Sequence, residues 1–397
     1  MNGRAVGVTA VAPAVPAIAA DEATLVIVPP ITDCVVGGLT LVRRIVLAAT
    51  AAGYGQILVR HGEPALRDGL SGTRAIMLTP SSTSPAALGR RVVVMPGNVL
   101  PQASWLRALR EAPMKRESVA VDHALAIVVD TDDPVAVVRA TAKAVDADGL
   151  ARELARTFAH APPPADVQGR FRIVAPADVA RAERWLLRSL IKQREGFMSR
   201  HFERRLSLAL TRRLARTAIT PNMMTAISAA IGLLGATFFL SPAPRWQLAG
   251  ALLFLAHSIL DGCDGELARL RFQHSRWGAM LDFWGDNVVH VAVFVCIAVG
   301  WSRSVGAAWP LALGAIASVA TLGSAALFFG RTIEDRVEAG SGVARVVDAL
   351  GSRDFIYVVV LLSLFGKVTW FLMAAAIGAP IYLLLALWLH GRHGRVR

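Results

Sequence analysis

The chain has 397 residues, of which 54% are hydrophobic and only 18% charged. A water-soluble protein carries about 25% charged residues, and long apolar runs begin at Met223, so a wholly soluble chain is disfavoured. The net charge of +13 suits an anionic membrane face or a phosphate-rich substrate, and with membrane spans present we expect no nucleic-acid partner.

Short apolar runs alternate with helical patterns in the first half of the chain. A helix is predicted at 40–52, and strands are predicted at 23–28, 56–60, 75–79, 91–95 and 124–129. This alternation predicts a soluble α/β layer with a largely parallel sheet. The proline-rich stretch 161–164 interrupts the pattern. We therefore assign residues 1–165 to this domain and 166–199 to a linker and a helix, the helix at about 177–192.

A basic amphipathic segment covers residues 200–217. Its apolar positions recur on one helical face among several arginines: Phe202, Leu206, Leu210 and Leu214. This composition is typical of a helix that lies in the membrane interface. The alternative is a solvated helix that packs on the soluble domain, and the membrane span that follows directly favours the interface.

The remaining residues, 218–397, are predicted to form a six-helix membrane domain. The expected spans are 223–241, 247–263, 279–300, 308–329, 355–366 and 369–389. A span needs about 20 apolar residues, and the fifth is short. With six spans, the arginine-rich loops all fall on one side, which the positive-inside rule makes cytoplasmic. The expected location is the cell (inner) membrane, multi-pass, with both termini cytoplasmic.

Four aspartates lie around the second and third predicted spans. Asp261 and Asp264 have i, i+3 spacing, and Asp282 and Asp286 have i, i+4 spacing, so two facing helices present four carboxylates to one point. Acidic residues at membrane depth are costly and usually functional. Clustered carboxylates repel one another unless cations neutralise them, and hard oxygen ligands favour Mg²⁺ or Mn²⁺. Two such ions would clamp a diphosphate and its attacking oxygen.

Small and basic residues accompany these aspartates. Gly265, Ala268 and Gly278 leave room for close approach of helices and a nucleotide, and Arg269 answers phosphate charge. A membrane transporter with a proton relay would also use intramembrane carboxylates, but it needs no adjoining glycine and arginine pattern. A catalytically silent membrane scaffold is a third alternative, which the four intact aspartates disfavour.

The residues from Asp261 to Asp286 read D-x2-D-G-x2-A-R-x8-G-x3-D-x3-D. This pattern resembles the signature of the CDP-alcohol phosphotransferase (CDP-alcohol phosphatidyltransferase) family at every fixed position. The resemblance covers about residues 195–390 and includes Thr220-Pro221-Asn222 before the first span. It implies six transmembrane helices, a cytoplasm-facing active site and an enzyme that cleaves a CDP-alcohol, releases CMP and joins the phospho-alcohol to an acceptor hydroxyl.

The same resemblance implies the site residues. The four aspartates would bind two divalent cations, and Asp286 would be the general base on the acceptor hydroxyl. The implied CDP-binding residues are Asn222, Gly265, Ala268, Arg269 and Gly278. The resemblance also implies a homodimer in contact with membrane lipid.

A narrower resemblance concerns the substrates. Residues 195–222 are similar to the same region of bifunctional inositol-1-phosphate cytidylyltransferase / di-myo-inositol-phosphate-phosphate synthase proteins, as is Ser352-Arg353-Asp354. The donor is therefore expected to be CDP-diacylglycerol or CDP-inositol, in phospholipid or inositol-phosphodiester synthesis. Arg331 and Arg353 are candidates for binding a phosphorylated acceptor, although positive-inside charge alone explains either arginine equally well.

Residues 37–59 are similar to the helix and strand that follow the nucleotide loop of sugar-phosphate nucleotidyltransferases. Two features of that family are missing. PPITDC at 29–34 replaces the glycine-rich basic loop, and MPGN at 95–98 stands where a metal-binding aspartate is expected. The N-terminal domain is therefore predicted to be nucleotidyltransferase-like but degenerate and non-catalytic.

Overall fold

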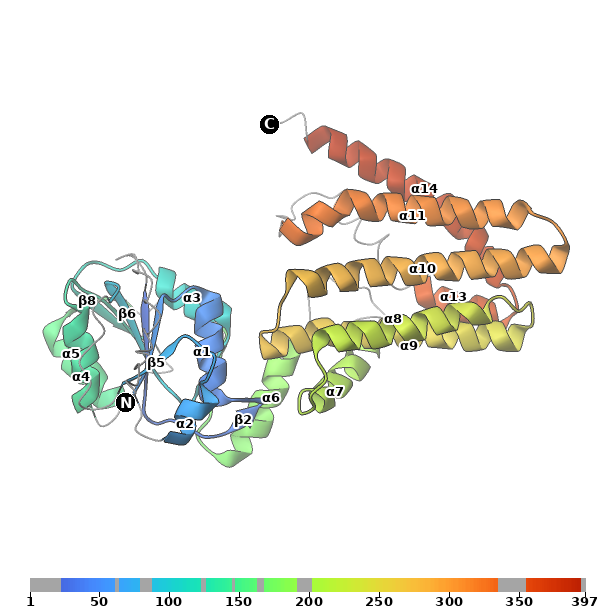
Figure 1. Cartoon of the computed structure of the whole chain (residues 1–397). Helices are drawn as coiled ribbons and strands as arrows, with labels where there is room; N and C mark the ends of the chain where they lie inside the picture. Colours follow the sequence, from blue (N-terminus) through green and yellow to red (C-terminus); the bar gives the residue numbers. More distant parts are fainter. Residues whose placement is uncertain are drawn as a thin grey trace, which may run out of the picture. The chain divides into compact units, whose positions relative to one another are not determined.

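The computed structural model describes residues 23–60, 64–78, 88–122, 126–144, 147–162, 168–190, 202–334 and 355–393. The chain divides into two compact units, residues 1–185 and 186–397 (Figure 1). Each unit is described by itself.

The first unit is an α/β unit. Its strands are β1 Thr24–Val28, β2 Val35–Val36, β3 Leu39–Thr40, β4 Gln56–Arg60, β5 Ala75–Leu78, β6 Arg91–Pro96, β7 Val99–Pro101, β8 Ser118–Val121, β9 Ile127–Asp130, β10 Ala159–His160 and β11 Arg170–Arg172. Its helices are α1 Leu41–Ala52, α2 Pro64–Gly69, α3 Ala103–Glu111, α4 Pro134–Lys143, α5 Ala147–Thr157 and α6 Pro176–Ser189, the last of which continues into the second unit.

A seven-stranded sheet, in the order β10-β8-β9-β6-β1-β4-β5, forms the centre of this unit. Helices α1 and α3 cover one face and α4 and α5 the other (Figure 1). Valines in alternate positions of β1 and β6 turn toward α4 and α5, where they form a buried core with Val137 and Leu150. The prediction of an α/β region with a sheet is confirmed.

Two details of the sheet differ from the prediction. Strands β8 and β10 were not predicted, and β9 runs antiparallel to both of its neighbours, β6 and β8. The strand expected at 124–129 is β9 at Ile127–Asp130, and residues 123–125 lie outside the described part of the chain. The other neighbouring pairs in this sheet are parallel.

The second unit is helical. Its helices are α7 Arg204–Leu214, α8 Pro221–Phe238, α9 Pro244–Arg271, α10 Arg276–Val305, α11 Trp309–Glu334, α13 Phe355–Leu364 and α14 Val368–His393. Within the described residues, five helices are long and apolar enough to cross a membrane: α8, α9, α10, α11 and α14. The chain is therefore a multi-pass membrane protein. The predicted fifth span coincides with α13, which has only 10 residues.

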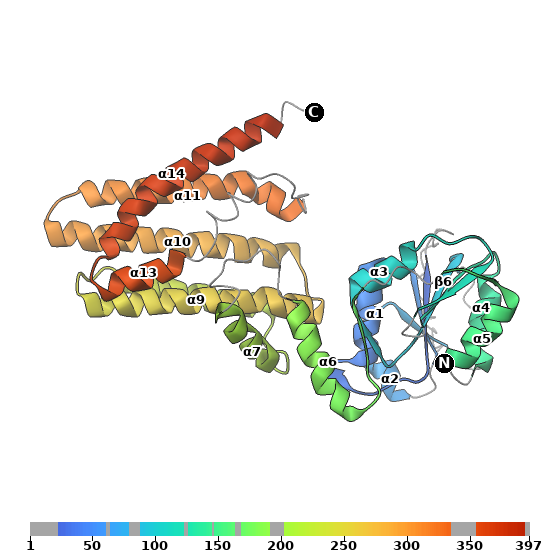
Figure 2. The same cartoon turned by 180° about the vertical axis from the view of Figure 1, so that it is seen from behind.

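Helices α8, α9, α10 and α11 run side by side, and α14 crosses α11 (Figures 1 and 2). Glycines bring α8 and α9 into close contact: a Cβ at Gly250 would lie 2.7 Å from the carbonyl oxygen of Gly235. Buried side chains such as Phe254, Val293 and Leu372 fill the centre of the bundle. Close backbone packing of this kind holds membrane helices together where no hydrophobic effect drives them.

The turn between α9 and α10 positions the aspartates. Phe272 takes a left-handed φ of 56° at the end of α9. The Ser275 side chain then accepts a hydrogen bond from Gly278 N at the start of α10. Because the chain reverses within these few residues, the aspartates near the end of α9 face those near the start of α10.

Helix α7 packs on α9 through its polar side. Ser207 and Thr211 are buried, while Phe202 and Leu206, on the apolar face, are 49% and 45% exposed. A soluble helix would bury its apolar face instead.

Candidate functional site

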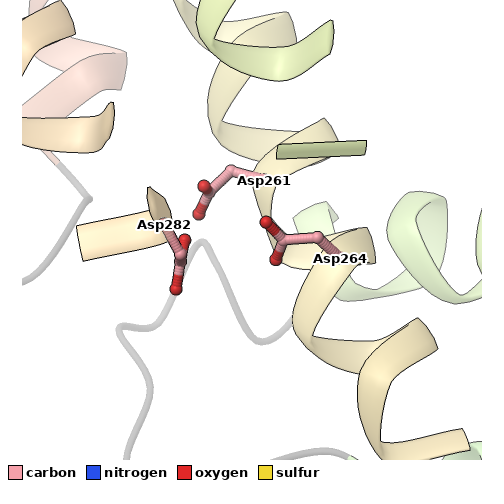
Figure 3. Close-up of side chains that lie close together, drawn as sticks. All are labelled: Asp261, Asp264 and Asp282. Carbon is pink, nitrogen blue, oxygen red and sulfur yellow. The ribbon is translucent and has the colours of Figure 1, made fainter. Parts of the chain in front are cut away.

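Three carboxylates meet where α9 faces α10. Asp261, Asp264 and Asp282 each offer one oxygen, and these oxygens all lie within 4.8 Å of one another. Figure 3 shows the three side chains converging from the two helices. Asp261 and Asp264 are buried. Buried anionic oxygens at this separation repel one another, so the group is suited to hold a cation.

The surroundings of the carboxylates also fit a cation. Asp282 Oδ1 is buried and has no hydrogen-bond partner among the described residues. Asp264 Oδ2 accepts a hydrogen bond from the Thr225 hydroxyl of α8, which fixes the direction of that carboxylate. An unpaired buried carboxylate oxygen beside two further carboxylates matches the oxygen-only ligand sets of Mg²⁺ and Mn²⁺.

Asp286 lies one turn after Asp282 on α10 and outside the group of three converging oxygens. Its Oδ1 is 3.5 Å from Nε2 of His257, which belongs to α9. The side chain of Asp286 is 18% exposed. Part of this side chain is therefore open to an incoming group, and one of its oxygens is in contact with His257 of α9.

The structure brings two pairs of the other predicted donor-side residues together. Asn222, at the start of α8, lies against Gly278 of α10: a Cβ at Gly278 would be 2.7 Å from Asn222 Oδ1. The Arg269 side chain lies over Gly265, where an added Cβ would be 3.2 Å from Arg269 Nη1. Ala268, half-buried, is on the same helix. The absence of side chains at Gly265 and Gly278 leaves space beside the Arg269 guanidinium and the Asn222 amide.

The two predicted acceptor residues are not tested by the structure. Arg331 belongs to the last described turn of α11, and its side chain is not among those described. Arg353, together with Ser352 and Asp354, lies outside the described residues.

A second polar cluster joins α7 to α9, at Glu266. Glu266 of α9 is fully buried, and its carboxylate accepts hydrogen bonds from Ser207 Oγ at 2.7 Å and Thr211 Oγ1 at 2.7 Å. Arg204 Nη1 pairs with the same carboxylate at 2.6 Å. Arg271 donates to carbonyl oxygens at the end of α7 and in the segment after it, among them Leu214 O and Ile219 O. The end of α9 that carries Asp264 is thus tied to α7.

The substitution Glu266→Ala is expected to lower the free energy of unfolding by about 3 kcal/mol, because Arg204 loses its buried partner. Release of α7 can be followed through Cys263, which is buried with its Sγ 3.5 Å from Ser207 O. In a background of Cys34→Ser and Cys296→Ser, maleimide labelling of Cys263 should accelerate by about tenfold or more. Glu266→Gln, which keeps acceptor and volume, should show a smaller change. Equal labelling rates in Glu266→Ala and its parent would contradict the role of this cluster in joining α7 to α9.

Sequence reasoning missed three residues of this region. Glu266 occupies a variable position of the motif, and Thr225 is a single hydroxyl in an apolar span. His257 is a single histidine in an apolar span, and its contacts with Ser228 and Asp286 join residues far apart in the sequence. For Glu266, the available signal was a carboxylate in an apolar helix, which requires a buried partner.

This arrangement defines the second unit as a membrane domain with an acidic, metal-suited site at the junction of two helices. Residues 218–393 match the family model described as CDP-alcohol phosphatidyltransferase. This part of the chain is therefore a CDP-alcohol phosphatidyltransferase domain, and the recognition made from the aspartate signature is confirmed.

Several curated relatives match parts of the chain. The bifunctional IPC transferase and DIPP synthase of Thermococcus kodakarensis is 39% identical over 115 residues, which is 29% of this chain and 26% of the relative. The protein of the same name from Rubrobacter xylanophilus is 38% identical over 145 residues, 36% of this chain and 32% of the relative. The CDP-diacylglycerol–serine O-phosphatidyltransferase of Mycobacterium tuberculosis is 39% identical over 77 residues, 19% of this chain and 26% of the relative. The chain thus spans about a third or less of the length of these relatives.

Among solved structures, phosphatidylinositol phosphate synthase of Mycobacterium tuberculosis with CDP-DAG bound is similar to this chain at 21% identity and a TM-score of 0.34. The match covers 46% of this chain and 94% of that one.

Proposed function

We propose that the protein is a CDP-alcohol phosphotransferase, which transfers a phospho-alcohol group from a CDP-alcohol to an acceptor hydroxyl and releases CMP. One observation carries this proposal: three carboxylates converge within 4.8 Å inside a membrane domain, and one of them has a buried, unpaired oxygen. The match of residues 218–393 to the CDP-alcohol phosphatidyltransferase family supports the choice of reaction.

The residues are proposed to act as follows. Asn222, Gly265, Ala268, Arg269 and Gly278 bind the CDP part of the donor, with Arg269 meeting phosphate charge. Asp286 accepts the proton of the acceptor hydroxyl. The acceptor oxygen then bonds to the phosphorus that carries the donor alcohol. The bond from that phosphorus to the bridging pyrophosphate oxygen breaks, and CMP leaves with the bond's electron pair.

Divalent cations would be held by Asp261, Asp264 and Asp282, with Asp286 as a fourth ligand. We propose two ions, Mg²⁺ or Mn²⁺, as the number that four carboxylates neutralise. When bound, such ions offset the charge of the diphosphate and of the departing CMP. The protein's own contribution is to hold the carboxylates on two rigid helices, so that donor and acceptor meet in one orientation.

The donor is proposed to be CDP-diacylglycerol or CDP-inositol, and the acceptor an inositol phosphate or another alcohol. The similarity to relatives named IPC transferase and DIPP synthase supports an inositol-containing pair. Similarity to a CDP-diacylglycerol–serine O-phosphatidyltransferase supports a lipid donor. Arg331 and Arg353 are proposed to bind a phosphorylated acceptor.

We also propose a topology of six spans, in which α13 is a short fifth span, in the cell (inner) membrane with both termini cytoplasmic. Arginines gathered in the loops of one side support this orientation. Helix α7 is proposed to lie in the membrane interface, because its apolar face is exposed while its polar face binds Glu266. A homodimer is proposed by family resemblance, and the mass of the detergent-solubilised particle tests it.

The N-terminal unit is proposed to be non-catalytic. In parallel α/β sheets, ligands bind beyond the carboxyl ends of the strands. Here the segment after β1 covers that edge: a Cβ at Gly97, just after β6, would lie 2.7 Å from Ile31 Cγ1. Gly97 N also donates to Val28 O at 2.9 Å. The chain's own atoms thus occupy the place where a phosphate-binding loop would open.

Release of CMP by the purified protein in detergent tests the proposed function. CDP-diacylglycerol and CDP-inositol are supplied separately, each with a panel of acceptor alcohols and with Mg²⁺ or Mn²⁺. We expect acceptor-dependent CMP release that EDTA abolishes.

The alternatives give different results in the same preparation. A transporter would move a solute in proteoliposomes without CMP release, and a silent scaffold would bind no CDP-alcohol. Failure of the folded protein to release CMP with any pair and to bind either donor would overturn the proposal.

A further inference from the structure

One histidine lies at the meeting point of three membrane helices. His257 of α9 is buried, 3% exposed, and sits one turn before Asp261. Its Nδ1 lies 2.9 Å from the carbonyl oxygen of Ser228 in α8, and its Nε2 lies 3.5 Å from Asp286 Oδ1 in α10. The ring also stacks on Phe254, with centroids 6.1 Å apart. Both ring nitrogens and one face of the imidazole are therefore in contact with neighbouring groups.

The contact with Ser228 determines which ring nitrogen carries the hydrogen. A carbonyl oxygen only accepts hydrogen bonds, so Nδ1 carries the hydrogen and donates it. With Nδ1 committed to α8, Nε2 is the ring atom turned toward Asp286. The backbone of α8 thus orients the imidazole toward the proposed general base.

The space for the ring depends on Gly232. A Cβ added at Gly232 would lie 2.9 Å from His257 Cγ and 2.6 Å from Val289 Cγ1. A polar side chain inside a membrane bundle is costly unless it is paired, and a purely structural position in this apolar core would be better filled by leucine. Three features instead place an imidazole against Asp286: the missing side chain at Gly232, the carbonyl oxygen of Ser228 and the stacked ring of Phe254.

We propose that His257 is a positioning residue that orients the Asp286 carboxylate toward the acceptor hydroxyl. This inference rests on the proposed function, in which Asp286 accepts the proton of that hydroxyl. A carboxylate on a helix rotates about two side-chain bonds, and proton transfer needs one orientation within about 0.5 Å. Contact of one oxygen with a fixed imidazole restricts the rotation and so directs the other oxygen. His257 touches neither substrate; it acts through Asp286.

Steady-state kinetics of His257→Ala in the CMP-release assay tests this role. We expect kcat to fall by about 10- to 100-fold, with KM for donor and acceptor within about twofold of wild type. Donor affinity, measured by direct binding of the CDP-alcohol, should also stay within about twofold. His257→Gln, whose side-chain amide reaches a similar point beside the carboxylate, should recover part of the lost kcat.

Val289→Ala is the matched control, because it removes packing at the same three-helix junction and leaves the His257 contacts in place. We expect it to lower the thermal midpoint while kcat stays near wild type. An unchanged kcat in His257→Ala would overturn the positioning role, as would equal losses of kcat in both variants. If the wild-type protein releases no CMP, the proposed function itself fails; only a loss confined to the histidine variants supports His257.

Discussion

Replacement of Asp286 by asparagine is expected to lower kcat by about 10²- to 10⁴-fold while CDP-alcohol binding persists. The amide has nearly the shape of the carboxylate but cannot accept the acceptor's proton. Asp261, Asp264 and Asp282, whose oxygens converge, all remain in this variant, so it removes the fourth proposed ligand and leaves the other three in place. Single-turnover CMP release, together with direct binding of the donor, separates the loss of chemistry from the loss of binding.

Glu266→Gln serves as the control for Asp286→Asn. It makes the same carboxylate-to-amide change in the facing helix, at a residue that binds α7 rather than the site. We expect this variant to turn over at close to the wild-type rate, although with a lower thermal midpoint. Full turnover by Asp286→Asn would remove Asp286 from the role of base. If Asp286→Asn also loses donor binding, Asp286 has a role in binding the donor instead.

The aspartate site could be predicted because its geometry is local. All four aspartates lie between Asp261 and Asp286, on two helices joined by a short turn. Their spacings place each pair on one helix face, and the turn makes the faces meet. The predicted span 247–263 nevertheless ended just before Asp264, while the span 279–300 already held Asp282 and Asp286. Helical hydrogen bonding continues past that point, so α9 and α10 carry the aspartates within unbroken helices of 28 and 30 residues.

The partners of the site could not be predicted, since they depend on which helices become neighbours. Glu266 meets Thr211, 55 positions earlier, and His257 meets a backbone carbonyl at Ser228. The apolar face of residues 200–217 was visible in the sequence. That its polar face would be buried follows only from the position of the Glu266 carboxylate.

In the N-terminal unit, β1, β4 and β6 were predictable because buried parallel strands are continuous apolar runs. Strand β8 has only 4 residues, SVAV, and follows a polar stretch, so its sequence carries no clear period. The antiparallel direction of β9 is a property of the connection between β8 and β9 and leaves no mark in residue types.

The metal requirement has its own test, because it predicts that the substitution Asp282→Asn changes thermal stability in opposite directions with and without the ion. In EDTA, Asp282→Asn is expected to unfold at a higher temperature than the wild type, since it removes one of three carboxylates held within 4.8 Å and relieves their repulsion. With saturating Mn²⁺ the order should reverse. An ion at about 100 times its Kd stabilises the wild type by about 2.7 kcal/mol, and the variant binds it far less well.

Thermal midpoints of both proteins, with and without Mn²⁺, measure this crossing without reference to turnover. Glu266→Gln should keep the full Mn²⁺-dependent shift, because its carboxylate faces α7 and not the other aspartates. An equal Mn²⁺ shift in Asp282→Asn and wild type would remove Asp282 from the ligand set. A wild-type protein more stable than Asp282→Asn in EDTA would mean that the buried, unpaired oxygen of Asp282 is stabilised by the protein alone. The carboxylates would then have a structural role. The sign of the difference in thermal midpoint between the two proteins in EDTA therefore decides whether the three carboxylates destabilise the protein without an ion or stabilise it.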